Sequence, residues 1–149
     1  IHSEVFGISP MDDSDDSVSN YMNIDYETDI EHHHNHFLLD KPKILKSLST
    51  DNEAINFIKS RKWDLIYIDG SHDYSIVKKD ISNSIPNLSK GGIIVLDDSS
   101  LFQDFNTDEF AFPVFKGHKG PSKAFEEILK ENKLNFLFGV GHNNIFINT

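Results

Sequence analysis

Short runs of apolar residues alternate along this chain with segments in which apolar residues recur at helical spacing. Residues 65–68 and 93–96 are continuous apolar runs, the pattern of strands covered on both faces of a parallel sheet. About 24 residues separate the two runs, enough for a helix that returns the chain to a parallel neighbour. The pattern therefore predicts a β–α–β unit over residues 63–98.

Four further strands are predicted from apolar and β-branched residues between turn signals. Two precede the β–α–β unit, and two follow it as a hairpin around Gly141-His142-Asn143. Residues 11–31 and 99–120 are predicted as loops, the first with at most one short helical piece. The four strands are expected at residues 4–8, 44–48, 135–140 and 144–148.

Three helices are predicted from their end signals. Thr50 and Glu53 form a capping box that opens a helix reaching residue 61. Ser71 or Asp73 caps a second helix, which Pro86 ends before a turn at residues 90–92. Pro121 suits the first turn of a third helix, which reaches about residue 132. On the second helix, Lys78, Lys79 and Asp80 are expected on the solvated face.

This order of elements predicts one α/β domain over residues 1–149. Its sheet is expected to be doubly wound and mostly parallel, with the C-terminal antiparallel hairpin at one edge. No apolar run approaches the ~20 residues of a membrane span, so no membrane contact is expected. The absence of cysteine excludes disulfides and thiolate metal ligands. A cytoplasmic location is the default expectation.

The net charge of −10 is unevenly distributed. The first 40 residues hold ten of the 24 acidic residues and no Lys or Arg, so the rest of the chain is neutral. Nucleic acid is therefore not an expected partner, because phosphate binding needs a basic face. The acidic segment is interpreted as a solvated loop rather than a surface for a cationic partner.

Carboxylates follow both strands of the β–α–β unit. Asp69 ends the first strand, and Asp97 and Asp98 end the second. Neighbouring parallel strands lie ~4.8 Å apart and end at the same edge, where open α/β sheets bind ligands. Taken singly, Asp69-Gly70 is an ordinary turn and Asp73 an ordinary helix cap. The equivalent placement of three carboxylates favours a functional site.

The sequences IDGSHDY (residues 68–74) and GGIIVLDD (residues 91–98), with the late strand pair, resemble the S-adenosylmethionine-dependent class I methyltransferases. The most similar branch includes metal-dependent O-methyltransferases of sugars and natural products. EVFGISP (residues 4–10) supports the resemblance more weakly. The resemblance covers residues 5–146 and implies a Rossmann-like fold with S-adenosylmethionine as cofactor.

The resemblance also implies roles for particular residues. Asp69, Asp97 and Asp98 would bind Mg²⁺ or Mn²⁺, and His72 would be the general base, with Asp73 as a substitute. The cofactor would contact Gly7, Ser9, Asp69 and Gly70.

The resemblance and this chemistry together predict Mg²⁺-assisted O-methylation of a sugar or glycoside hydroxyl, on a small-molecule or glycan acceptor. Mg²⁺ prefers hard oxygen ligands and polarises a bound hydroxyl, and imidazole accepts protons near neutral pH. A homo-oligomer is compatible with the sequence.

Two departures from the family pattern leave alternatives open. A Gly-rich turn after a first strand is absent, and Ser9 stands where the family usually has an acid for the ribose. We expect the chain to be the C-terminal part of a longer protein. The alternatives are a degenerate methyltransferase fold that acts as a binding module, and a different enzyme that uses the same carboxylates for a metal.

Two other segments carry candidate chemistry. The histidine cluster at residues 32–36 is expected to be a surface loop or lid, because consecutive side chains in a loop diverge and make poor metal sites. Residues 116–120 precede the third helix and could hold an anion or line the acceptor pocket. An ordinary connecting loop is the favoured interpretation of this segment.

Overall fold

The computed structural model describes residues 4–11, 25–104 and 114–149. Residues 12–24 of the first predicted loop and 105–113 of the second lie outside the described residues. The chain divides into two compact units, Ile1–Phe57 and Ile58–Thr149. A single domain over residues 1–149 stays a prediction.

The described residues of the first unit form a two-stranded parallel sheet, one helix and most of a second helix. Strand β1 (Phe6–Ser9) pairs in register with β2 (Lys43–Lys46), so that Gly7 lies opposite Ile44. Helix α2 (Asn52–Lys59) begins two residues after the predicted Thr50 cap, and its Phe57 ring packs 5.6 Å from that of Phe6. Both strands and this helix were predicted.

Helix α1 (Tyr26–His36) corrects the sequence prediction for the histidine cluster. The carboxylate of Asp25 caps its first turn by accepting a hydrogen bond from the backbone N–H of Thr28 at 3.1 Å. Acidic residues lie in the first turn and histidines in the last, as the helix dipole favours. The expected surface loop at residues 32–36 is therefore wrong in secondary structure, although no residue of this helix is buried.

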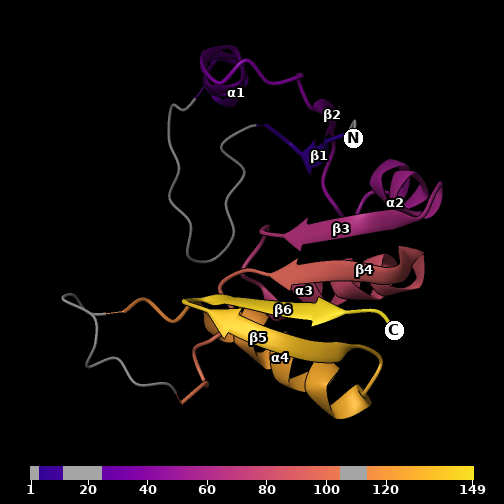
Figure 1. Ribbon diagram of the computed structural model, residues 1–149, viewed down its shortest axis with the longest axis vertical. Helices are drawn as coiled ribbons and strands as arrows, with labels where there is room; N and C mark the ends of the chain where they lie inside the picture. The colour runs from indigo at the N-terminus through magenta and orange to yellow at the C-terminus, as the bar shows by residue number, and fades with distance from the viewer. Residues whose placement is uncertain (1–3, 12–24, 105–113) are drawn as a thin grey trace. The chain divides into compact units, whose positions relative to one another are not determined.

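The second unit contains a four-stranded sheet with the order β3-β4-β6-β5 (Figure 1). Its strands are β3 (Trp63–Ile68), β4 (Leu88–Leu96), β5 (Asn135–Val140) and β6 (Asn143–Ile147). β3 and β4 are parallel, and β6 runs antiparallel to both of its neighbours. The expected C-terminal antiparallel hairpin at one edge of the sheet is thus confirmed. The antiparallel strand β6 lies inside the sheet, and the edge strand β5 runs in the direction of β4.

Helices α3 (Tyr74–Ser84) and α4 (Lys119–Glu131) cover one face of this sheet (Figure 1). Asp73 is the N-cap residue of α3, and Pro86 lies in a short 3₁₀ helix (Ile85–Asn87) that follows it, as predicted. The core between helices and sheet is formed by apolar side chains from every layer, including Val77, Ile81, Ile94, Leu96, Phe125, Ile128 and Phe146.

Three details differ from the sequence prediction. β4 starts at Leu88 and so includes residues 90–92, which were predicted as a turn. The irregularity there is a bulge between the Trp63–Leu88 and Leu65–Ile93 pairs. Within the described residues, β3 is covered on one face only, the face on which α3 and α4 lie (Figure 1). Leu65 is on the opposite face and is 60% exposed. Asp80 is buried rather than solvated, since it lies on the inner face of α3 between Val77 and Ile81.

The α/β class with mostly parallel strands is confirmed. Among the helices of the described residues, none has the length and apolar character needed to cross a membrane.

Candidate functional site

The carboxyl ends of β3 and β4 lie side by side, as the sequence predicted. The backbone N–H of Asp97 donates to the carbonyl of Ile68 at 3.0 Å, which joins the two strand ends. Asp69, Asp97 and Asp98 then line one small cavity of about 10 Å³, together with Gly70 and His72. This volume is enough for about one water-sized particle.

The carboxylates of this cavity repel one another. Partial burial of the Asp69 carboxyl and the adjacent Asp97 raise the pKa of Asp69 to about 6, with a smaller contribution from Asp98. His72 opposes this shift because a positive imidazole favours the charged carboxylate. A site that disfavours the ionised form of its own acid has the electrostatics of a cation site.

Asp97 supplies an independent sign of a cation site. Its Oδ1 atom is buried and accepts no hydrogen bond within the described residues. Buried polar atoms nearly always have a partner, and an exception calls for an ion or water at the site. The carboxylate cluster and this unsatisfied oxygen together fit a divalent cation, whose preferred ligands are carboxylate oxygens.

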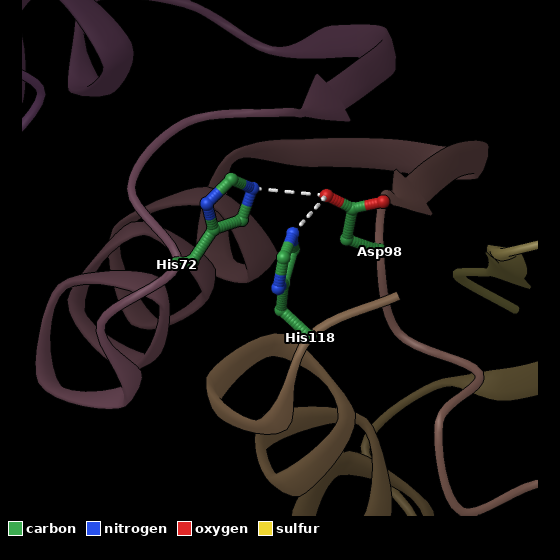
Figure 2. A group of neighbouring side chains, drawn as sticks. All are labelled: His72, Asp98 and His118. Carbon is green, nitrogen blue, oxygen red and sulfur yellow. Dashed lines mark ion pairs between the residues drawn. The ribbon is translucent and has the colours of Figure 1, made fainter. Parts of the chain in front are cut away.

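Two histidines converge on one oxygen of Asp98 (Figure 2). His72 Nε2 lies 2.9 Å and His118 Nε2 3.8 Å from Asp98 Oδ2. The two imidazole rings are 4.1 Å apart between centroids and tilted by 40°. Asp98 therefore holds His72 in one orientation at the mouth of the site.

The backbone of Asp98 is fixed from the other side by the segment before α4. Asp98 has a left-handed backbone with φ of 51°, and its carbonyl accepts a hydrogen bond from the N–H of His118 at 2.8 Å. An antiparallel bridge pairs Ser99 with Gly117. The segment at residues 116–120, for which an ordinary loop was favoured, thus supports the site directly.

A third histidine reaches the site from the hairpin between β5 and β6. Because β6 runs antiparallel to β4, its first residues lie at the carboxyl end of β4, where Asn144 pairs with Leu96. His142 Nε2 lies 3.3 Å from Asp97 Oδ1 and 4.0 Å from Asp98 Oδ1. The carbonyl of His142 accepts a hydrogen bond from Ser99 N–H at 2.8 Å.

Sequence reasoning did not assign His118 or His142 to the site. For His142 a signal existed. A final hairpin whose second strand pairs antiparallel with the acidic strand must place its turn beside the acidic tip. His118 belongs to the segment at residues 116–120, which was considered as a lining of the acceptor pocket, but its position before α4 does not by itself predict a contact with Asp98.

Tyr67 lies beside the carboxylates on the exposed face of β3. Partial burial of its phenol, followed by the charges of Asp97 and Asp69, raises its pKa to about 12. The phenol therefore stays protonated and donates a hydrogen bond to Asn143 Oδ1 at 3.1 Å.

The remaining predicted cofactor contacts lie in the first unit. A Cβ atom on Gly7 would lie 2.8 Å from Ile44 Cδ1, so this glycine leaves room for the end of the Ile44 side chain. The hydroxyl of Ser9, at the end of β1, accepts a hydrogen bond from the N–H of Met11 at 3.1 Å. Their cofactor roles, like the roles of Asp69 and Gly70, stay predictions.

Residues 3–99 match a family described as "Methyltransferase domain". The match covers 97 of the 149 residues, so the chain belongs to this methyltransferase family. The predicted class I S-adenosylmethionine-dependent methyltransferase family is thereby confirmed. A comparison with curated protein sequences gave no match.

Two solved structures share the fold. An O-methyltransferase family protein from Burkholderia thailandensis superposes with a TM-score of 0.53 at 13% identity, over 83% of this chain and 40% of that protein. A candidate O-methyltransferase from Klebsiella pneumoniae gives 0.51 at 15% identity, over 85% and 59%. The chain thus spans less than two thirds of either protein.

Proposed function

We propose that this protein catalyses methyl transfer from S-adenosylmethionine to a hydroxyl group of a sugar or glycoside, assisted by a divalent cation. The observation that carries the proposal is the convergence of Asp69, Asp97 and Asp98 beside His72 at the ends of β3 and β4. Family membership supports the reaction class, and the carboxylates with an adjacent imidazole support an oxygen acceptor.

Asp69, Asp97 and Asp98 would hold the cation, Mg²⁺ or Mn²⁺. When bound, such an ion supplies Lewis acidity that lowers the pKa of a hydroxyl and stabilises the developing alkoxide. The raised pKa of Asp69 and the unsatisfied Oδ1 of Asp97 support this role, because a cation would relieve both.

His72 is the proposed proton acceptor. The acceptor oxygen forms a bond to the methyl carbon as the bond from that carbon to the sulfonium breaks, and the hydroxyl proton passes to the imidazole of His72. Asp98, 2.9 Å from His72 Nε2, orients this ring and stabilises the imidazolium that results. His72 is thus catalytic and Asp98 positions it.

Gly7, Ser9, Asp69 and Gly70 are the proposed contacts of the cofactor. Ser9 can only share neutral hydrogen bonds with ribose hydroxyls, so this contact would be weaker than that of a carboxylate.

The proposal is tested by measuring methyl transfer from isotope-labelled S-adenosylmethionine to a panel of sugars and phenols. His72→Gln is expected to lower the rate by roughly 10²–10⁴-fold, the usual effect of losing a general base. His36→Gln on the exposed helix α1 is the matched control and should leave the rate unchanged.

Failure would have a specific meaning. If a folded chain binds no S-adenosylmethionine and labels no acceptor, the proposal fails for this chain by itself. Product formation with His72→Gln at the wild-type rate would remove His72 from the mechanism while leaving the reaction class intact.

A further inference from the structure

We infer that His142 is a nitrogen ligand of the cation held at Asp97 and Asp98, so that the site prefers a first-row transition-metal ion such as Fe²⁺, Co²⁺ or Zn²⁺ to Mg²⁺. The inference rests on the proposed function for the presence of a cation. To that function it adds His142 as a ligand and transition-metal ions as the preferred class of cation.

The distances fit a shared ion. The candidate ligand atoms of Asp97, Asp98 and His142 all lie within 4.8 Å of one another. Two ligands about 2.1 Å from one ion, at tetrahedral or octahedral angles, are roughly 3.0–3.4 Å apart. His142 Nε2 is 3.3 Å from Asp97 Oδ1, and its 4.0 Å from Asp98 Oδ1 requires only a small rotation of the carboxylate.

The unsatisfied oxygen of Asp97 is the atom that faces His142. Asp97 Oδ1 is buried and accepts no hydrogen bond within the described part of the chain, although His142 Nε2 is close. A direct hydrogen bond would satisfy both groups, yet the pair does not have the geometry of one. An ion between them would satisfy the carboxylate and the imidazole together.

The hairpin keeps His142 at this position. Its backbone is tied to the tip of β4 by the hydrogen bond from Ser99, and the next residue accepts from Tyr67. Its ring contacts the ring of Phe115 edge-on at 5.4 Å between centroids. A ligand held by three elements loses little entropy on binding an ion.

The donor set determines the metal class. Mg²⁺ prefers oxygen ligands and retains water, whereas imidazole suits Fe, Ni, Cu and Zn. Aspartates alone would bind Mg²⁺ or Mn²⁺, and the addition of an imidazole shifts the preference toward the later metals. The ratio of transition-metal to Mg²⁺ affinity therefore reports the contribution of His142.

Helix α1 requires a background variant for the test. His32 and His36 lie one turn apart, with ring centroids 6.4 Å from each other, and such a pair can chelate a transition metal on its own. The four α1 histidines are therefore replaced in every protein compared (His32→Gln, His33→Gln, His34→Gln and His36→Gln). None of them is a proposed ligand.

In this background, Co²⁺ and Mg²⁺ are titrated separately by calorimetry into the parent chain and into its His142→Asn variant. The visible absorption of bound Co²⁺ is recorded in parallel. His118→Asn is the matched control, because His118 is similarly exposed and faces the other oxygen of Asp98. Circular dichroism without metal verifies that each variant is folded.

The parent is expected to bind Co²⁺ more tightly than Mg²⁺. His142→Asn should lower the affinity for Co²⁺ by at least about tenfold and shift the absorption bands of bound Co²⁺. Its affinity for Mg²⁺ should fall by less than about threefold. His118→Asn should change the ratio of the two affinities by less than about threefold.

Three results would overturn the inference. One is an unchanged ratio of Co²⁺ to Mg²⁺ affinity in His142→Asn. Another is a larger loss of Co²⁺ affinity in His118→Asn than in His142→Asn, which would put the ion beside His72 instead. The third is a folded parent that binds neither ion. None of these results depends on methyl transfer. A protein that methylates without a cation would still form labelled product, and a protein that forms no product could still be tested for metal binding.

Discussion

Gly117 lies against Asp98 so closely that no side chain fits between them. A Cβ atom placed on Gly117 would be 2.1 Å from the carbonyl oxygen of Asp98, and Gly117 also has a φ of 104°. Both the space and the backbone conformation require glycine at this position. This contact is what lets the segment before α4 hold the tip of β4.

Gly117→Ala is therefore expected to lower the free energy of unfolding by more than about 3 kcal/mol, because backbone strain and a clash with fixed backbone add. The measurement is equilibrium unfolding in urea. Gly91→Ala is the matched control, since Gly91 has a φ of 76° with nothing within 4 Å of the added atom. It should cost about 1 kcal/mol. Equal costs for the two variants would mean that the close contact with Asp98 does not stabilise the fold.

Asp69 is expected to destabilise the metal-free protein at neutral pH. Its pKa of about 6 in the folded state lies above the ordinary value of 3.8. The folded state therefore binds the proton more tightly, and stability is lost as the pH rises from about 4 through 6. Asp69→Asn should thus be more stable than the parent by about 1–2 kcal/mol above pH 6, after allowance for solvent screening, and by much less at pH 4.

Thermal unfolding of both proteins in chelator between pH 4 and 8 measures this difference. Asp64→Asn, at an exposed position of the strand that precedes Asp69, is the control and should show no such trend. A constant difference between Asp69→Asn and the parent across this range would show that the raised pKa of the Asp69 carboxyl, caused by its burial and by the adjacent Asp97, is not what destabilises the protein.

Asn144 anchors the hairpin to the strand end that carries Asp97 and Asp98. Its buried amide donates to Ser99 Oγ at 2.8 Å and to Ser100 Oγ at 2.9 Å. Asn144→Ala should cost about 2–4 kcal/mol, because two buried hydroxyls lose a partner. Asn135→Ala removes an exposed amide bonded to Thr149, and is expected to change stability by less than about 0.5 kcal/mol. If urea unfolding showed comparable losses of stability in Asn144→Ala and Asn135→Ala, the role given to the buried hydrogen bonds of Asn144 would be wrong.

The sequence was sufficient to predict most of the second unit. Continuous apolar runs, Pro86 and Pro121 report local preferences, and these preferences agree with the final fold. The acidic tips were predictable for the same reason, because parallel pairing of the two strands that carry Asp69 and Asp97 dictates that they meet.

The errors occurred where long-range packing decides the outcome. Asp80 has the polarity of a surface residue, and only the position of α3 on the sheet buries it. The place of β6 between β4 and β5 depends on non-local pairing, and it brings His142 to the site. Helix α1 was missed because it has no apolar face to give it a helical pattern, and its Asp25 cap was the only local signal.

The most direct test of the account is a calorimetric titration of S-adenosylmethionine into the chain in the presence of a divalent cation. We expect saturable binding in the micromolar range, and weaker binding by Ser9→Ala, because the substitution removes the hydroxyl that is the proposed contact of the ribose. A folded chain that shows no heat of binding at millimolar cofactor would contradict the proposal that this chain by itself binds the methyl donor.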